Sequence, residues 1–256
     1  MLEAIHHDAI VELRLARPPV NALDPELVRT LRNAVESAPA NGARGIMLSG
    51  RAGMFSAGLD VPALLQLDRE EMIAFWHEFF GLCAALANSP IPVAAAIGGH
   101  SPAGGAVLAI FCDYRVMARS ADPEKPFRIG LNEVQVGLSV PECIQCALRR
   151  LIGPYRAERL MVSGAMLDSD QALTIGFVDE LAEVGHVDAR ALKWLQGLLK
   201  LPAQAMSTTR LLARADMFEI FSDPSKLSVE EFTEGWFGAE SQATLKALVS
   251  KLKKAQ

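Results

Sequence analysis

Glu133 has the side-chain chemistry of a proton carrier. It lies in the segment RIGLNEVQVGL (128–138), in which most neighbouring residues are apolar. A carboxyl group that loses its surrounding water has a raised pKa, which brings it into the range useful for a general acid or base. A lone glutamate is also typical of a solvated loop, so the residues alone leave both roles open.

A second candidate site is the glycine-rich loop GGHSPAGG (98–105), for which three interpretations exist. A phosphate-binding loop is excluded because Gly105 stands where that motif needs lysine, and no dinucleotide fingerprint G-x-G-x-x-G is present. A nucleophile elbow at Ser101 is disfavoured because the following Pro102 has no N–H to serve an oxyanion hole. The third interpretation makes Gly104 and Gly105 the first turn of a helix, where free N–H groups favour developing negative charge. A tight, close-packed helix start would explain the same glycines.

The segment FSAGLD (55–60) is another loop of small residues, and it follows a buried strand. Its backbone would supply a second N–H, and an oxyanion hole needs two converging donors. The same segment is also typical of a simple turn in which Asp60 accepts hydrogen bonds from nearby backbone N–H groups.

The elements that must position these loops alternate between strands and helices. Ile10–Leu15 alternates like a strand, and Asp24 followed by Pro25 predicts the start of a helix. The later segments predict strands at 45–50, 90–97 and 113–118, and helices at 69–89, 106–111, 141–152, 154–163 and 169–175. We therefore predict an α/β fold with mostly parallel strands.

Beyond about Val187 no strand pattern recurs. We predict two parts, a core at 1–196 and a helical C-terminal region at 197–256. In the second part Ser228 and Glu231 form a capping pattern at a helix start, and the last helix ends in lysines, which are favourable at a helix C-terminus.

Composition and charge exclude several classes of function. A formal net charge of −5 argues against binding to nucleic acid or to an anionic membrane, both of which require a concentrated basic surface. The most apolar segment, 92–112, is interrupted by glycines, a histidine and a proline, so it does not predict a membrane span. The first residues lack the basic and apolar regions of a secretory signal.

Four cysteines do not form a disulfide framework in a chain of 256 residues, so we expect a reducing compartment, the cytoplasm. Cys143 and Cys146 form one C-x-x-C inside a predicted helix. No second pair or histidine cluster completes a zinc site, so we expect two core residues and no metal.

Four motifs taken together resemble the crotonase superfamily, which contains enoyl-CoA hydratases and isomerases. They are FSAGLD, PIPVAAAIGG, PAGGAVLAIFCDYRV and IGLNEVQVGL, in the order and at the spacing of that family. The resemblance implies a spiral of ββα repeats and a helical C-terminal region that mediates trimers, with a homotrimer or a hexamer as the assembly. It also implies an acyl-CoA thioester as the substrate, with no separate cofactor.

The resemblance assigns roles to individual residues. The two oxyanion donors map to the backbone N–H groups of Leu59 and Gly104, and the catalytic carboxylate maps to Glu133. The substrate-binding positions are small or apolar residues around the two loops: Ala22, Leu23, Ala57, Gly58, Gly105 and Val107.

Val107 narrows the expected reaction. Many hydratases of the superfamily carry two glutamates, and Val107 occupies the position of the first of them. Hydration requires a water held beside two proton-transfer groups, whereas moving a double bond from C3 to C2 needs one base that removes a proton at C2 and returns it at C4. The motifs are most similar to the Δ3,Δ2-enoyl-CoA isomerase branch, so we expect this activity in fatty-acid β-oxidation.

Several alternatives remain open at this point. Hydration, thioester hydrolysis or decarboxylation would use Glu133 or the nearby Glu142, although an acidic residue is also typical of a first helical turn. Some members of the superfamily bind RNA or act as scaffolds, which the acidic balance disfavours. The final lysines, Lys251, Lys253 and Lys254, either contact CoA phosphates or form a solvated helix end.

Overall fold

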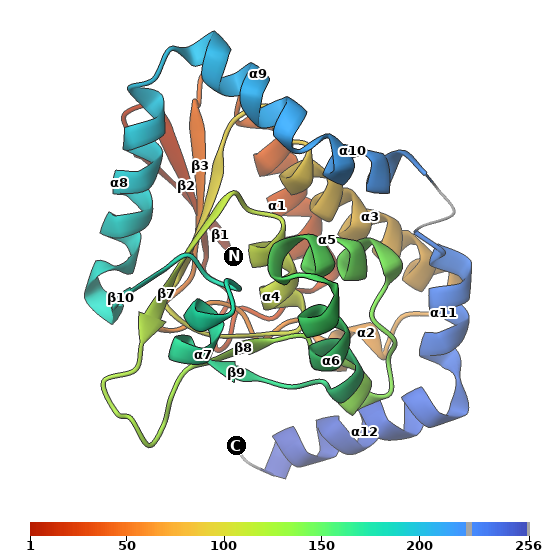
Figure 1. The fold of residues 1–256 in the computed structure, drawn as a ribbon. Helices are drawn as coiled ribbons and strands as arrows, with labels where there is room; N and C mark the ends of the chain where they lie inside the picture. The colour runs from red at the N-terminus through yellow and green to blue at the C-terminus, as the bar shows by residue number, and fades with distance from the viewer. Residues whose placement is uncertain (224–226, 255–256) are drawn as a thin grey trace.

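A six-stranded sheet forms the centre of the molecule in the computed structural model, which describes residues 1–223 and 227–254 (Figure 1). The strand order is β1-β2-β3-β5-β7-β10, and neighbouring strands are parallel except for the antiparallel pair β1 and β2. Its strands are β1 (Leu2–His7), β2 (Ile10–Leu15), β3 (Gly45–Ser49), β5 (Val93–Ile97), β7 (Tyr114–Arg119) and β10 (Glu180–Glu183).

A second, four-stranded sheet has the order β4-β6-β8-β9. It consists of β4 (Gly53–Met54), β6 (Gly99–Pro102), β8 (Arg128–Gly130) and β9 (Leu167–Asp168). β4, β6 and β8 are parallel, and β9 is antiparallel to β8.

Three consecutive stretches of chain follow the same path through both sheets. Each contributes a strand to the large sheet, then a strand to the small sheet, and then one or more helices. The stretches are β3-β4 with α2 (Val61–Leu64) and α3 (Arg69–Ala87), β5-β6 with α4 (Gly104–Ile110), and β7-β8 with α5 (Glu142–Ile152). The predicted α/β class and the spiral of ββα repeats are confirmed.

Local capping explains where the two long helices of the first half begin. Asp24 Oδ1 accepts the Leu27 N–H (2.8 Å) at the start of α1 (Pro25–Ser37). At the start of α3, Asp68 and Glu71 form a reciprocal capping box. The two helices pack against each other, and α3 buries a cluster of large side chains that includes Trp76.

The large sheet is covered on both faces, which accounts for its nearly continuous apolar strands. α8 (Val187–Leu199) packs Val187, Ala191 and Leu195 onto residues of β2, β3, β5 and β7. The main core lies on the other face, among α1, α3, α4 and α5. Figure 1 shows α8 on one side of the sheet and α1 and α3 on the other.

Helices dominate the rest of the described chain. They are η1 (Glu133–Val136), α6 (Pro154–Ser163), α7 (Ser169–Thr174), η2 (Val184–His186), α9 (Ala203–Ala213), α10 (Ala215–Ser222), α11 (Val229–Phe237) and α12 (Ala239–Lys254). The helical character predicted for the C-terminal region is confirmed for its described residues, and residues 224–226 and 255–256 of that region lie outside them.

Two arginines attach the C-terminal helices to the core. Arg210 donates to both carboxylate oxygens of Asp113 (2.9 and 2.8 Å), and Arg214 donates to one of them (3.0 Å). Asp113 also accepts the Val93 N–H (2.8 Å) at the start of β5. The boundary predicted between residues 196 and 197 falls inside α8, and the division into two parts stays a prediction.

One predicted loop contains a strand. Within 98–105, which was expected to be a tight loop, residues Gly99–Pro102 form β6 between β4 and β8. This strand lacks the apolar pattern by which a strand is predicted from sequence. It forms because its backbone can approach that of β4 closely. A Cβ atom at Gly99 would lie 2.0 Å from the Gly53 carbonyl carbon. The described chain has no helix long and apolar enough to span a membrane.

Candidate active site

Two loops that are distant in sequence meet at Gly58 and Gly104. A Cβ atom added at Gly58 would lie 3.1 Å from the Gly104 nitrogen, and one added at Gly104 would lie 3.4 Å from the Leu59 nitrogen. The Leu23 side chain borders the same space, with its Cδ1 3.0 Å from that second position. The two predicted oxyanion donors therefore line one small space, together with Leu23.

Neither of the two predicted donor N–H groups has a hydrogen-bond acceptor among the described residues. The N–H groups on either side of Leu59 are engaged, Gly58 with Ser56 Oγ (3.1 Å) and Asp60 with the Leu23 carbonyl (3.0 Å). The Leu59 N–H donates to no acceptor within residues 1–223 and 227–254. Gly104 is the first residue of α4, so its N–H has no partner inside the helix. The pair is suited to hold a carbonyl oxygen that becomes negatively charged.

Hydrogen bonds join the loop of Leu59 to the chain before α1. The Asn21 side-chain amide donates to the Phe55 carbonyl (3.0 Å), and Ser56 Oγ donates to the Asn21 carbonyl (2.7 Å). The Ala57 N–H donates to the Val20 carbonyl (2.9 Å). Asn21 is buried and has a left-handed φ of 53°, which asparagine tolerates better than most residues. The Leu23 N–H also donates to the Gly58 carbonyl (2.8 Å), and the Ala22 carbonyl accepts from Arg17 Nη1 (3.2 Å). The predicted substrate-binding residues Ala22, Leu23, Ala57 and Gly58 therefore belong to one hydrogen-bonded unit.

Ala103 holds the other loop in an unusual backbone conformation. Its φ of 44° and ψ of −119° are rare for a residue with a Cβ atom. The Ala103 N–H donates to the Gly130 carbonyl (2.8 Å), which ties the loop to β8. Backbone strain of this kind persists where the surrounding structure enforces it, and it is concentrated at active sites.

Glu133 is the first residue of η1, three positions after Gly130. The residue is half-buried, but its Oε2 is completely enclosed and has no hydrogen-bond partner in the described structure. Burial raises the pKa of Glu133 to about 7, an effect that a hydrogen bond from its own backbone partly opposes. The neighbouring Asn132 also has an enclosed side-chain oxygen without a partner in the described chain. A carboxyl group in this condition is ready to take up or release a proton near neutral pH.

Helix α12 packs on the turn that carries Glu133. Ser241 Oγ donates to the Gly137 carbonyl (2.5 Å) at the end of η1. Gly137 has a φ of 78°, and a Cβ atom there would lie 3.1 Å from Ser241 Cα. α12 also contacts α2, the helix that follows Leu59. One C-terminal helix therefore touches both halves of the candidate site.

Two further predicted residues lie on α4. Val107 is buried and has the apolar character expected of a pocket lining. Gly105 is packed inward, since a Cβ atom there would lie 2.8 Å from the Ser56 carbonyl oxygen and 3.0 Å from Ser101 Oγ. Close packing accounts for this glycine, and substrate contact by Gly105 and Val107 stays a prediction.

The rival residues are poorly placed for chemistry. Ser101 is fully buried beneath Gly105, which leaves a nucleophile there without access to a substrate. Glu142 is exposed in the first turn of α5. Cys143 is buried and Cys146 half-buried in the same helix, and no metal-binding cluster of histidine, cysteine or acidic residues occurs among the described residues.

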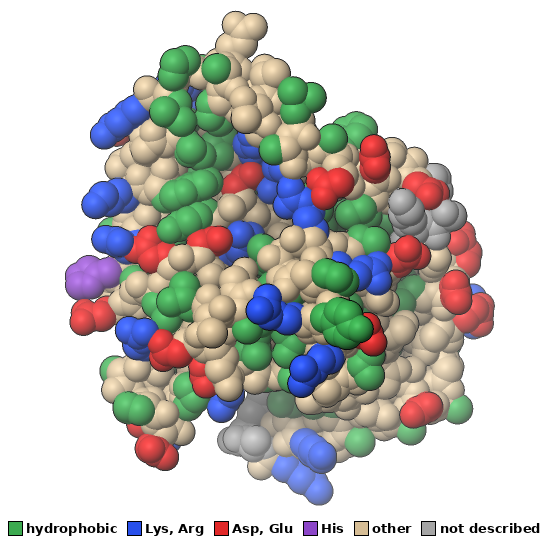
Figure 2. Space-filling model, in the orientation of Figure 1, with side chains coloured by type: hydrophobic (Ala, Val, Ile, Leu, Met, Phe, Trp, Pro, Cys, Tyr) green, Lys and Arg blue, Asp and Glu red, His purple; other side chains and the backbone are tan. Residues whose placement is uncertain are grey.

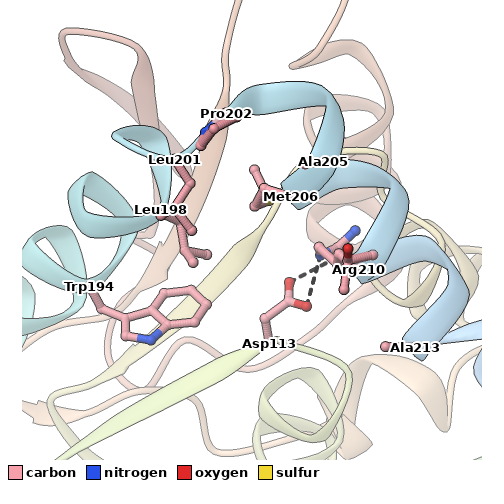
Figure 3. A pocket seen from close by; sticks show the side chains of 10 residues that line it. Asp113, Trp194, Leu198, Leu201, Pro202, Ala205, Met206, Arg210 and Ala213 are labelled. Atoms are coloured by element: carbon pink, nitrogen blue, oxygen red, sulfur yellow. Dashed lines mark hydrogen bonds and ion pairs between the residues drawn. The ribbon is translucent and has the colours of Figure 1, made fainter.

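A cavity of about 530 Å³ opens elsewhere, between α8 and α9, and contains none of the predicted site residues. Figure 3 shows Trp194, Leu198 and Met206 on its apolar wall and the ion pair of Asp113 with Arg210 at one end. The two charges pair with each other, so neither Asp113 nor Arg210 is a free charged group in this cavity.

Sequence reasoning missed the residues that hold the loops in place. Arg17, Asn21 and Ser56 act through contacts that span up to about forty positions of the chain, and no local motif marks them. Ala103 carries no sequence signal either, because alanine is not the residue that a positive φ normally selects.

Known proteins resemble this chain over most of its length. A family model described as enoyl-CoA hydratase/isomerase matches residues 6–252. Human mitochondrial enoyl-CoA delta isomerase 1 is 31% identical over 80% of this chain and 67% of its own length. The probable enoyl-CoA hydratase EchA17 of Mycobacterium tuberculosis is also 31% identical, over 81% of this chain and 77% of its own length.

Solved structures agree with the sequence comparison. The crystal structure of human mitochondrial delta3-delta2-enoyl-CoA isomerase has a TM-score of 0.92 and 27% identity, and covers 100% of this chain and 99% of its own. The crystal structure of the enoyl-CoA hydratase EchA3 of Mycobacterium ulcerans has a TM-score of 0.81 at 27% identity, over 93% of this chain and 99% of its own. The chain belongs to the enoyl-CoA hydratase/isomerase family, the crotonase superfamily.

Proposed function

We propose that this protein is a Δ3,Δ2-enoyl-CoA isomerase that acts on acyl-CoA thioesters in fatty-acid β-oxidation. The observation that carries the proposal is the state of the Glu133 carboxyl group, whose Oε2 is enclosed and has no hydrogen-bond partner among the described residues, and whose pKa burial raises to about 7. It lies three positions after Gly130, the last residue of β8, whose carbonyl accepts the N–H of Ala103 in the loop of Gly104. The similarity to the human isomerase over the whole chain supports the same reaction.

The reaction begins with removal of a proton from C2 of a 3-enoyl-CoA by the ionised Glu133. Electrons from the broken C–H bond delocalise over C2, C3, C4 and the thioester carbonyl, and the product of this step is a dienolate. Its negative charge lies largely on the thioester oxygen, which the N–H groups of Leu59 and Gly104 stabilise. Donors of this kind contribute about 3 to 4 kcal/mol each in a site that excludes water.

The same proton then returns to C4, which places the double bond between C2 and C3. The protonated Glu133 delivers it, because burial gives the acid and base forms similar stability near neutral pH. No second carboxylate is required, which agrees with Val107 on α4 in the position where many hydratases carry a glutamate. An apolar side chain at this point also gives an activated water no hydrogen-bond partner.

The substrate supplies CoA, and the proposed reaction needs neither a metal nor a separate cofactor. We assign the hydrogen-bonded unit of Ala22, Leu23, Ala57 and Gly58 to the CoA end of the substrate. The lysines at the end of α12 are exposed and remain candidates for the CoA phosphates.

The assembly that we propose is a homotrimer, alone or paired into a hexamer. Large apolar side chains are exposed on and near α9 and α10, with Leu212 73% and Phe218 60% exposed. Figure 2 shows hydrophobic side chains gathered between α8 and α9, where the cavity of 530 Å³ opens. Light scattering would test the assembly, and Leu212→Glu with Phe218→Glu should convert it to monomers. A monomeric wild type would contradict it.

A cytoplasmic location is proposed on the state of the cysteines. Cys83, Cys112 and Cys143 are buried as free thiols, and burial raises the pKa of Cys112 and Cys143 to about 12. The human relative is named as a mitochondrial protein. Fluorescence imaging of the tagged chain in its own cells would distinguish the two compartments.

The decisive assay compares 3-hexenoyl-CoA and 2-hexenoyl-CoA as substrates. Wild type should form the conjugated 2-enoyl thioester rapidly, seen as a gain of ultraviolet absorbance, and should hydrate 2-hexenoyl-CoA slowly. Glu133→Gln should lower kcat for isomerisation by about 10² to 10⁴, the range that general acid–base catalysis contributes. Glu142→Gln is the matched control and should retain activity. Hydration faster than isomerisation would make the protein a hydratase, and an active Glu133→Gln would refute the proton shuttle.

A further inference from the structure

Arg17 connects two helix-capping carboxylates that belong to different loops of the candidate site. Its Nε lies 2.9 Å from Asp24 Oδ2, and its Nη2 lies 2.6 Å from Asp60 Oδ2. The third nitrogen, Nη1, donates to the Ala22 carbonyl (3.2 Å). All three guanidinium nitrogens therefore contact either the segment before α1 or the loop of Leu59.

Each aspartate has a second task that its other oxygen performs. Asp24 Oδ1 accepts the Leu27 N–H (2.8 Å) and caps α1, whereas Asp60 Oδ1 accepts the Ala63 N–H (3.1 Å) and caps α2. The Arg17 guanidinium thus fixes the starts of two helices relative to each other. Because each carboxylate also bonds a backbone N–H of its helix, the position of the Arg17 guanidinium restrains the backbone at the start of both helices.

The backbone held in this way includes the oxyanion donor. Leu59 directly precedes Asp60 and forms a parallel bridge with Leu23, which directly precedes Asp24. The bridge consists of the Leu23 N–H bonded to the Gly58 carbonyl (2.8 Å) and the Asp60 N–H bonded to the Leu23 carbonyl (3.0 Å). Arg17 closes the end of this bridge, one residue beyond Leu59.

Partial burial strengthens the contact. The side chains of Arg17, Asp24 and Asp60 are only 22%, 15% and 12% exposed, so solvent screens their charges less than on an open surface. The planar guanidinium presents its donors in a fixed fork, which a lysine ammonium cannot reproduce. Three acceptors at fixed positions determine the location of the fork, and the fork in turn restrains all three.

We infer that Arg17 is a positioning residue for the reaction, which sets the Leu59 N–H against the thioester oxygen through Asp60. The inference rests on the proposed function, because it takes the Leu59 N–H as an oxyanion donor. Arg17 touches neither the reacting carbons nor the transferred proton. Its effect belongs to the step in which charge develops on the oxygen, so its loss should lower kcat more than it raises KM.

The main test is Arg17→Met, which keeps an unbranched side chain and removes the fork. A donor displaced by about 1 Å costs on the order of 100-fold in rate, so kcat should fall about 10- to 100-fold, with a smaller change in KM. Arg17→Lys should retain little more kcat than Arg17→Met, because one ammonium group cannot bind three separated acceptors. Millimolar guanidinium chloride should partly rescue an Arg17→Ala variant, in which the site for the ion is open.

The matched control is Arg32→Met. Arg32 is also partly exposed, at 31%, and pairs with two carboxylates, Glu36 and Glu78, but it lies between α1 and α3 and in neither loop. Its loss should leave kcat unchanged. Asp60→Asn should lower kcat more than Asp24→Asn, since Asp60 adjoins the donor and Asp24 does not.

A spectroscopic readout separates positioning from general damage. Infrared difference spectra of bound butyryl-CoA, labelled with ¹³C at the thioester carbonyl, report how strongly the two N–H groups polarise that carbonyl. In wild type the carbonyl band should lie at a lower frequency than in the free thioester. In Arg17→Met its frequency should lie between those two values. A folded Arg17→Met with an unchanged band and unchanged kcat would overturn the inference.

The two hypotheses can fail separately. If wild type does not isomerise 3-hexenoyl-CoA, the proposed function is wrong, whereas the band shift of butyryl-CoA still tests Arg17. If wild type isomerises and Arg17→Met differs from it only in thermal stability, Arg17 is merely structural and the proposed function stands.

Discussion

The two halves of the candidate site, the loops of Leu59 and Gly104 and the turn of Glu133, differ in how their polar groups are hydrogen-bonded. Around Leu59, the polar side chains are paired: Asn21, Ser56 and Arg17 with its two aspartates form hydrogen bonds or ion pairs within the protein. Around Glu133, two buried oxygens have no partner in the described residues. The first half is tightly hydrogen-bonded and offers the two N–H donors, whereas the second half is dehydrated and its unpaired oxygens belong to Glu133 and Asn132.

This contrast follows from what each half does in the proposed reaction. Stabilising a developing charge requires donors that are already aimed, since reorientation during the reaction would cost free energy. Transferring a proton requires a group whose two protonation states are close in free energy, and burial achieves this for a carboxyl group. Four predictions test the contrast, in order of decreasing effect.

Gly104→Ala should damage the half around Leu59 and Gly104 most. The new Cβ atom would lie 3.0 Å from Leu23 Cδ1 and 3.4 Å from the Leu59 nitrogen, in the space for the thioester oxygen. Loss of an oxyanion donor costs about 10² to 10³ in kcat, and we expect a loss of this size. Gly197→Ala, at a helical glycine with open space around it, should have no effect on kcat. Equal activity of the two variants would contradict an oxyanion hole at Gly104.

Glu133 should determine how kcat/KM depends on pH. Glu133 must be ionised to remove a proton, and burial raises its pKa to about 7. The value of kcat/KM should therefore rise with pH and level off above about 7, so that at pH 5 it is about 100-fold below the plateau. A profile that levels off near pH 4.5 would show that Glu133 is solvated in the free enzyme.

The raised pKa also predicts that Glu133 costs stability at neutral and alkaline pH. Since the folded protein binds this proton more tightly than the unfolded chain, the stability that the proton contributes is lost as pH rises from about 4.5 to about 7. Glu133→Gln removes the buried charge. The difference in free energy of unfolding between this variant and wild type should therefore shift by about 2 kcal/mol in favour of the variant from pH 5 to pH 8. Urea unfolding at both pH values would measure it, with Glu142→Gln as a control without this gain.

Ser241→Ala should have the smallest effect, because it removes one hydrogen bond to the Gly137 carbonyl behind Glu133. We expect about 1 kcal/mol of lost stability and a severalfold decrease of kcat. Ser250→Ala, in the same helix, removes a hydrogen bond to the Lys246 carbonyl (2.9 Å) at the exposed face and should leave kcat unchanged. If the two variants behave alike in kcat, α12 has no part in placing Glu133.

Much of the fold could be predicted from local patterns, because its elements begin and end with local signals. Asp24 with Pro25 marks α1, and Asp68 with Glu71 marks α3. The short apolar run that ends at Ile97 marks β5, a strand buried on both faces. In contrast, β1 was missed because its exposed residues break the alternation, and β6 because it depends on backbone contact between Gly53 and Gly99.

The sequence by itself determined which residues are candidates: one glutamate in an apolar segment, two loops of small residues, and a valine in place of a second acid. Only the tertiary structure decided that Leu59 and Gly104, 45 positions apart, line one space, and that Arg17 restrains the loop of Leu59. It also decided the pKa of Glu133, which depends on the packing of distant segments around one oxygen atom. Residue types fix which chemistry is available, whereas distances and dehydration arise only when the chain folds.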